Sequence, residues 1–238
     1  MDQLLVALDV NTAADAFALA DRLRGVAGGF KIGSRLFTAE GPHVVTRLVE
    51  RGDRVFLDLK FHDIPSTVAG AVEAATGLGV WMMNVHASGG ADMMRAAKAA
   101  AVDTAARRGL ATPLVIGVTV LTSLDQRALD SLAIDEPVDA HVQRLARLAA
   151  QAGLDGVVAS PREVAGMRRW ADARFLVVTP GIRVGVPTDD QVRTAGAAEA
   201  LADGASYLVV GRPIIKAPDP RAAAERLASD AGIDRQPQ

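Results

Sequence analysis

The residues best suited to chemistry are charged side chains embedded in apolar segments of the chain. Asp58 and Lys60 are two residues apart in one such segment, so on a strand both point to the same face, about 6.6 Å apart along the strand. Asp63 follows Lys60, and Lys31 lies in the preceding apolar segment. A buried salt bridge is an equally good interpretation of Asp58 and Lys60 alone, but a lone buried pair stabilises a fold poorly. Four such charges favour a site that sets pKa values and the local potential.

The use of lysine at this site indicates what the charges do. The chain has four lysines against 22 arginines, and two of the four are Lys31 and Lys60. Arginine cannot release a proton near neutral pH, whereas lysine can act as a general acid or as a Schiff-base nucleophile. Because nearby carboxylates favour the ammonium over the free amine, the pattern favours a proton donor over a nucleophile.

A second group of residues fits an anion. Pro180-Gly181-Ile182-Arg183 and Gly211-Arg212 each follow an apolar segment. Arg183 and Arg212 can donate paired hydrogen bonds to phosphate oxygens, and Gly211 lets backbone N–H groups approach an anion at the start of a short helical turn. Two arginines in surface loops are the alternative. We expect residues 184–191 to form a mobile lid that brings Gln191 to a ligand.

The elements that must position these residues alternate along the chain. Short β-branched apolar runs predict eight strands, at residues 4–9, 30–33, 54–60, 80–86, 113–119, 156–160, 175–179 and 206–210. Helical spacing predicts eight helices between and after them, at residues 12–25, 37–51, 66–78, 90–108, 138–152, 162–171, 188–203 and 219–230. Eight such units predict an α/β protein with a single-domain (β/α)8 TIM barrel over residues 1–231 and a C-terminal tail over 232–238. A doubly wound open sheet is the competing fold. In the barrel, the charged residues follow the carboxyl ends of strands, where such barrels place their active sites.

Composition excludes several classes of protein. The 238 residues include no cysteine, which excludes disulfides, thiolate zinc sites and a cysteine nucleophile, and fits a reducing compartment such as the cytoplasm. The net charge of −2 and the lack of a basic run argue against a nucleic-acid partner. The apolar runs are too short to span a membrane. The histidines show no ligand spacing, so we expect no metal site.

The run Asp58-Leu59-Lys60-Phe61-His62-Asp63-Ile64-Pro65-Ser66-Thr67 resembles the signature of the orotidine 5′-phosphate decarboxylases, in their common bacterial branch. Further segments resemble the family in the same order along the chain: Leu8-Asp9, Lys31-Ile32-Gly33, Leu36–Pro42, Val118–Ser123, Thr179–Arg183 and Val210–Ile214. The resemblance implies a carboxy-lyase of de novo pyrimidine biosynthesis. Such an enzyme converts orotidine 5′-phosphate to uridine 5′-phosphate (UMP) and CO₂ without a cofactor, in the cytoplasm.

The resemblance also implies a role for each residue of the site. Lys60 would protonate the carbanion at C6 of the pyrimidine, and Asp58 would lie against the departing carboxylate. Lys31 and Asp63 would complete the charge network, with Asp63 coming from the partner subunit of a homodimer. The expected substrate-binding residues are Asp9 and Lys31 at the ribose, Thr122 at the base, Ile64 and Thr67 across the interface, and Pro180, Arg183, Gln191, Gly211 and Arg212 around the phosphate.

Two alternatives stay open from the sequence. The D-x-K-x-x-D pattern also occurs in Mg²⁺-dependent sugar-phosphate decarboxylases and aldolases on the same scaffold, and sensitivity to EDTA would separate these from a cofactor-free enzyme. A non-catalytic protein that binds nucleotide phosphates is the alternative of another class. The complete set of Lys31, Asp58, Lys60 and Asp63 argues against it.

Overall fold

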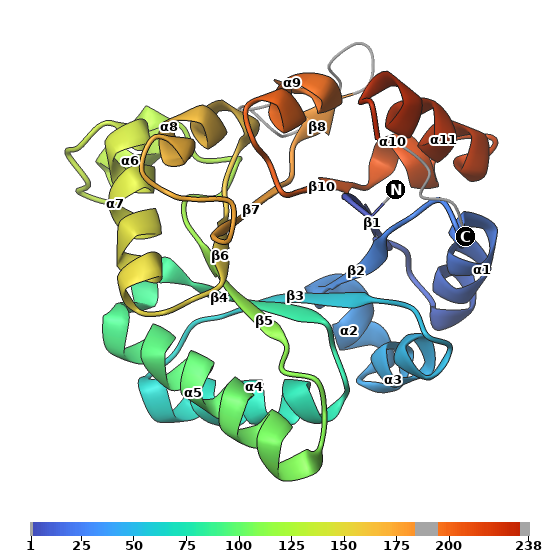
Figure 1. Ribbon diagram of the computed structural model, residues 1–238, viewed down its shortest axis with the longest axis horizontal. Helices are drawn as coiled ribbons and strands as arrows, with labels where there is room; N and C mark the ends of the chain where they lie inside the picture. Colours follow the sequence, from blue (N-terminus) through green and yellow to red (C-terminus); the bar gives the residue numbers. More distant parts are fainter. Residues whose placement is uncertain (1, 184–194, 234–238) are drawn as a thin grey trace.

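Eight parallel strands close into a barrel in the computed structural model, which describes residues 2–183 and 195–233. Neighbours around the barrel follow the order β1-β10-β7-β6-β5-β4-β3-β2, and β2 pairs with β1 to close it (Figure 1). The barrel strands are β1 (Leu4–Ala7), β2 (Gly29–Gly33), β3 (Val55–Phe61), β4 (Met82–His86), β5 (Leu114–Val118), β6 (Gly156–Val158), β7 (Leu176–Thr179) and β10 (Tyr207–Val210). The predicted (β/α)8 barrel and its eight strands are confirmed.

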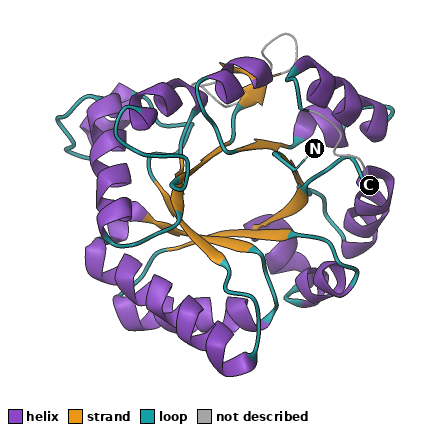
Figure 2. Ribbon diagram, in the orientation of Figure 1, coloured by secondary structure: helices purple, strands orange, loops and turns teal. Residues whose placement is uncertain are grey.

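Helices surround the ring of strands on its outer side (Figure 2). The α-helices are α1 (Ala13–Leu23), α2 (Ser34–Glu40), α3 (His43–Glu50), α4 (Pro65–Gly77), α5 (Ala91–Arg108), α6 (Gln126–Ser131), α7 (Val138–Gln151), α8 (Val164–Arg168), α9 (Ala197–Ala202), α10 (Arg212–Ile215) and α11 (Pro220–Asp230). Two 3₁₀ turns, η1 (Ala87–Gly89) and η2 (Pro161–Glu163), follow β4 and β6.

Three of the predicted helices differ in detail from those observed. The helix expected over 37–51 is two helices, because Gly41 ends α2 with a φ of 68° and Pro42 caps α3. The helix expected over 162–171 begins with η2, where Ser160 and Glu163 form a capping box. Of the helix expected over 188–203, residues 188–194 lie outside the described residues, and the rest contains α9, which directly follows β9 (Ala195–Gly196). β9 pairs with β8 (Ile182–Arg183) in a separate two-stranded sheet.

Apolar side chains form an inner and an outer core. Along β3, Phe56 points into the barrel, whereas Val55 and Leu57 point toward the helices, as the two-residue period of a strand requires. The inner core consists of Leu5, Ala7, Phe56, Met82, Ile116, Val178 and Val209. These residues fill the interior of the barrel before the carboxyl ends of the strands. The inward-facing residues further along each strand are therefore free to line a site at the carboxyl ends.

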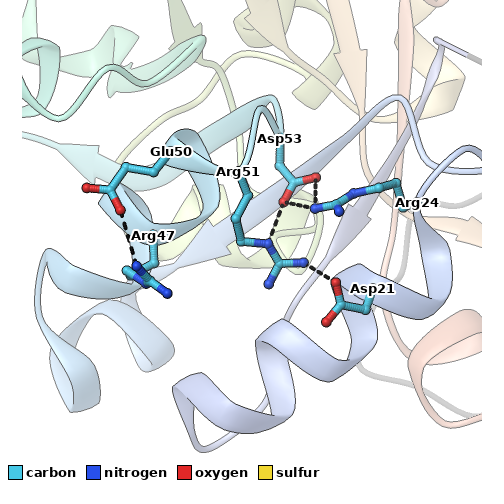
Figure 3. Close-up of polar contacts among 6 residues, drawn as sticks. All are labelled: Asp21, Arg24, Arg47, Glu50, Arg51 and Asp53. Carbon is cyan, nitrogen blue, oxygen red and sulfur yellow. Dashed lines mark hydrogen bonds and ion pairs between the residues drawn. The ribbon is translucent and has the colours of Figure 1, made fainter.

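Ion pairs connect the segments at the amino-terminal end of the barrel (Figure 3). The Asp53 carboxylate, just before β3, accepts hydrogen bonds from Arg24 at 3.1 and 3.2 Å and lies 3.5 Å from Nε of Arg51. Arg51 also contacts Asp21 of α1. The network therefore links α1 and the end of α3 to the start of β3, far along the strand from the charged residues at its other end.

Two further predictions concern membrane-spanning segments and the boundary between the barrel and the C-terminal tail. No helix in the described ranges is both long and apolar enough to cross a bilayer. Ile233 is buried in the outer core, beyond the end of α11. The division into a barrel over 1–231 and a tail over 232–238 stays a prediction.

Candidate active site

Four side chains of alternating charge form a continuous row at the carboxyl end of the barrel. Nζ of Lys31 lies 3.2 Å from Oδ1 of Asp9 and 3.2 Å from Oδ2 of Asp58. Nζ of Lys60 donates a hydrogen bond of 2.6 Å to the other oxygen of Asp58. The order Asp9–Lys31–Asp58–Lys60 therefore gives each interior member of the row two partners of opposite charge.

Three neighbouring strands supply this row. Asp9 follows the end of β1, Lys31 lies in β2, and Asp58 and Lys60 lie in β3. The parallel register pairs Ala7 with Lys31 and Gly33 with Asp58, which brings the carboxyl ends of the three strands together. Spacing along one strand predicted the Asp58–Lys60 pair, and strand pairing adds Lys31 and Asp9.

Burial and charge act in opposite directions on the central pair. The side chains of Lys31 and Asp58 are each 11% exposed. Burial alone would raise the pKa of the Asp58 carboxyl, but Lys31, Lys60 and their hydrogen bonds hold this pKa below its ordinary value. Burial alone would lower the pKa of Lys31, but Asp58 and Asp9 raise it above its ordinary value. Both groups therefore stay charged at neutral pH.

Lys60 has an unusual backbone and the more accessible of the two lysine side chains in the row. Its φ is +54°, in the left-handed region that non-glycine residues rarely adopt. The pairing of β3 with β4 shifts register between Leu57 and Phe61, so this conformation belongs to a bulge. The Lys60 side chain is 35% exposed, which leaves its ammonium in reach of a ligand in the cavity described next.

A cavity of about 250 Å³ opens above the charged row. Asp9, Lys31, Asp58 and Lys60 form one side of it. The rest of its lining comes from Ala7, Phe56, Val118, Val120, Leu121, Thr122, Val158, Ala159, Pro180, Gly181, Ile182, Val209, Gly211, Arg212 and Pro213. Thr122, Pro180, Gly211 and Arg212 were all predicted to bind substrate. An anionic ligand could thus extend from the Lys60 ammonium to the Arg212 side of the cavity.

Two predicted anion-binding residues are less fully described. The backbone of Arg183 lies in β8, directly after the cavity residue Ile182. Gln191, and the lid expected over 184–191, lie outside the described residues.

Asp63, Ile64 and Thr67 lie away from this cavity within one chain. All three are exposed, and Ile64 is 63% exposed, a high value for a large apolar side chain. Oδ1 of Asp63 accepts a hydrogen bond of 2.7 Å from the N–H of Ile64. The second carboxylate that the chain itself brings to Lys31 is Asp9, not Asp63.

Sequence reasoning missed two residues that shape the row. Asn84 of β4 contacts both Asp58 and Lys60. Gly33 leaves room for the Lys31 ammonium, because a Cβ at this position would lie 3.1 Å from Nζ of Lys31. Asn84 could have been predicted from its polar amide, which lies in an apolar segment next to the predicted buried charges. Gly33 could not, because its closeness to the Lys31 ammonium is visible only in the folded structure.

Two histidines lie near the bulge. The rings of His62 and His86 have centroids 5.3 Å apart. Burial, followed by the charges of His62 and Lys60, lowers the pKa of His86. We therefore expect His86 to be a neutral imidazole at neutral pH.

The carboxylates of the row already have cationic partners. Asp9 and Asp58 both face the Lys31 ammonium, and Asp58 also faces Lys60. Within residues 2–183 and 195–233, no three His, Cys, Asp or Glu side chains gather as a metal-binding group. The donor set of the row thus resembles a charge-balanced proton-transfer site more than a divalent-cation site.

Comparison with known proteins assigns this chain to a family. The family model described as orotidine 5′-phosphate decarboxylase / HUMPS family matches residues 2–227. The chain belongs to this family.

Individual relatives of the family align with nearly the whole chain. A protein from Moorella thermoacetica named orotidine 5′-phosphate decarboxylase is 53% identical over 231 residues, which cover 96% of this chain and 92% of that protein. A protein of the same name from Alkalilimnicola ehrlichii is 52% identical, with 94% of each chain covered. A crystal structure of orotidine 5′-phosphate decarboxylase from Lactobacillus acidophilus superposes with a TM-score of 0.85 at 35% identity, covering 96% of this chain and 98% of that one.

Proposed function

We propose that this protein converts orotidine 5′-phosphate to uridine 5′-phosphate and CO₂. The observation that carries the proposal is the Asp9–Lys31–Asp58–Lys60 row along a cavity that Arg212 lines with it. A phosphorylated pyrimidine carboxylate needs both features, an ammonium at the reacting carbon and cationic groups at the phosphate. The family and the names of the relatives support this substrate.

Lys60 is the proton donor of the proposed reaction. The bond between C6 and the carboxylate breaks, CO₂ leaves, and the electron pair of that bond stays on C6. An N–H of the Lys60 ammonium then transfers its proton to C6, and the neutral amine regains a proton from water. Because the ammonium is already held by Asp58, it stabilises the negative charge where that charge develops.

Asp58 and Lys31 keep the donor in place and charged. Asp58 lies against the departing carboxylate and binds the Lys60 ammonium. Lys31 balances the charge of Asp58 from the other side. The Asp58 carboxylate therefore stays ionised when a bound substrate excludes water from the site. Asp9 and Lys31 contact the ribose hydroxyls.

The rest of the cavity binds the parts of the substrate that do not react. Thr122 contacts the base, and Pro180, Gly211 and Arg212 surround the phosphate, together with Arg183 and Gln191. Binding energy from the phosphate is then available to position the pyrimidine against Lys60, which lowers the barrier rather than only the KM.

We also propose that the active unit is a homodimer in which Asp63 completes the partner's site. The exposed positions of Asp63, Ile64 and Thr67 on one segment support this arrangement. Burial of the exposed Ile64 side chain against an apolar surface of the partner would stabilise the dimer, and the Asp63 carboxylate beside it would reach a second copy of the row. We place the enzyme in the cytoplasm, which the absence of cysteine fits.

The test is the loss of orotate absorbance when the purified chain meets orotidine 5′-phosphate, with and without EDTA. We expect the same rate in both arms. A rate that EDTA abolishes and Mg²⁺ restores would favour the metal-dependent sugar-phosphate chemistry of the wider family. No loss of absorbance in either arm would contradict the proposed reaction.

A further inference from the structure

Asn84 connects the two residues that the proposed reaction depends on most. Its side chain is buried in the inward-facing layer of β4, with the residue only 1% exposed. Nδ2 of Asn84 donates a hydrogen bond of 2.7 Å to Oδ1 of Asp58. Oδ1 of Asn84 accepts a hydrogen bond of 2.9 Å from the backbone N–H of Lys60. Asn84 is not part of the cavity lining, so its effect on a substrate must pass through its neighbours.

The contact with Lys60 occurs where the strand ladder is broken. Leu57 pairs with Met83 and Phe61 pairs with Val85, so four steps along β3 match two steps along β4. The extra residues form the bulge in which Lys60 takes its φ of +54°. A non-glycine residue in this region costs about 1–2 kcal/mol. The amide of Asn84 replaces the ladder hydrogen bond that the bulge removes and so holds this conformation.

The contact with Asp58 has a second consequence. Oδ1 of Asp58 receives hydrogen bonds from both Asn84 and the Lys60 ammonium, while Oδ2 faces Lys31. With partners on both oxygens, the carboxylate has one orientation. That orientation defines where the Lys60 ammonium lies.

We propose that Asn84 is a positioning residue, which fixes the Lys60 backbone and the Asp58 carboxylate so that the Lys60 ammonium points at the reacting carbon. This inference rests on the proposed decarboxylation. A neutral amide suits the position, because it donates to a carboxylate and accepts from an N–H at the same time. An alanine leaves the Lys60 N–H without an acceptor and removes one donor to Asp58, and an ionised carboxylate cannot donate.

The test compares Asn84→Ala and Asn84→Asp with wild type. Thr76→Ala serves as the control, because Thr76 is equally buried and its hydroxyl makes one hydrogen bond of 2.8 Å to the Val72 carbonyl, inside α4. Decarboxylation rate, calorimetric affinity for UMP and the unfolding transition are measured for each protein. For Asn84→Ala we expect kcat to fall about 10²-fold, as for a small misplacement of a catalytic group, with UMP affinity within about threefold, as expected for a residue outside the binding contacts.

The Asn84→Asp protein separates positioning from a merely structural role. Its new carboxyl group faces Asp58 and the backbone N–H of Lys60, the Lys60 ammonium shares Oδ1 of Asp58 with it, and His86 lies two residues further along β4. Burial and the Asp58 charge favour the protonated form of this carboxyl group. Once protonated it can donate to Asp58 and accept from Lys60, as the amide does. We expect its kcat relative to wild type to rise as the pH falls. A ratio that does not change with pH, or an Asn84→Ala kcat within threefold of wild type, would overturn the proposal.

A crystal structure of Asn84→Ala provides an arm that does not depend on turnover. The proposal expects Lys60 to leave the left-handed region and its ammonium to move from Asp58. An unchanged Lys60 would count against Asn84 whatever the kinetics show. If wild type releases no CO₂ while this structural change occurs, the proposed reaction fails and the positioning role stands.

Discussion

Nζ of Lys31 lies 3.2 Å from Oδ2 of Asp58, and this contact joins β2 to β3 at the most buried point of the charged row. Burial alone would shift the pKa of each group toward its neutral form, and the charge of each group opposes this shift in the other, with help from Asp9 and Lys60. The pair therefore sets the charge state of the site before any substrate arrives. It also makes the stability of the protein depend on pH in a direction that can be worked out.

The first prediction concerns acid stability. The pKa of Asp58 is lower in the folded protein than in the unfolded chain, so its contribution is fully present above about pH 4, the ordinary carboxyl pKa, and is lost as the pH falls through the folded value. The unfolding free energies of wild type and Asp58→Asn are measured by urea titration from pH 6 to pH 2. We expect wild type to lose stability relative to Asp58→Asn below about pH 4. Parallel curves over this range would show that the row does not hold Asp58 ionised.

The second prediction tests the shared site. Asp63→Ala and Lys60→Ala proteins, each with little activity alone, are unfolded together and refolded at equal amounts. In a hybrid dimer one site then combines an intact Lys60 with an intact Asp63 of the partner, so random pairing restores about a quarter of wild-type activity in a two-fold symmetric dimer. Refolding each variant separately before mixing is the control. If Asp63 acts within its own chain, the hybrids recover nothing.

The third prediction concerns the space that Gly33 leaves. Its φ is −91°, which alanine can adopt, but the added Cβ would approach Nζ of Lys31 to 3.1 Å and Oδ1 of Asp9 to 3.5 Å. We expect Gly33→Ala to fold and to lose about 10- to 100-fold in kcat/KM, because the ammonium must move from its place in the row. Gly70→Ala is the matched control, since a Cβ there meets nothing within 4 Å. Equal activity of the two variants would be the contrary result.

The fourth prediction separates stability from catalysis. Asp53→Ala removes a carboxylate whose side chain is 6% exposed and leaves Arg24 and Arg51 without it (Figure 3). Because the arginines are partly exposed, we expect a loss of about 1–3 kcal/mol in unfolding free energy, with kcat unchanged. Glu50→Ala breaks the exposed pair with Arg47 and should cost less than about 0.5 kcal/mol. A fall in kcat for folded Asp53→Ala would contradict the separation of the two ends.

Much of this structure could be predicted from the sequence, because two of its signals are local. Continuous apolar runs indicate buried parallel strands, and charges inside such runs, as at Lys31 and Asp58, indicate partners. The two-residue period placed Asp58 and Lys60 on one face. These signals gave the eight strands and the Lys31, Asp58 and Lys60 side of the cavity.

What the sequence did not reveal depends on how strands pair. The bulge at Lys60 exists only against β4, so the left-handed backbone has no local signature, and the contacts of Asn84 with Lys60 and Asp58 follow from the same strand pairing. The resemblance placed Asp9 and Lys31 together at the ribose, but their ion pair follows from the register of β1 and β2. The break between α2 and α3 was readable at Gly41-Pro42, but the apolar spacing on either side ran through it.

The most direct test of the central claim is CO₂ release by Lys60→Ala with UMP affinity measured on the same protein. If Lys60 is the proton donor and other residues bind the nucleotide, CO₂ release falls by about 10³-fold or more, in the range for loss of general acid catalysis. UMP affinity then stays within a few-fold of wild type, as expected when ground-state binding is preserved. Turnover close to that of wild type, in a variant that folds and binds UMP, would contradict the assignment of Lys60.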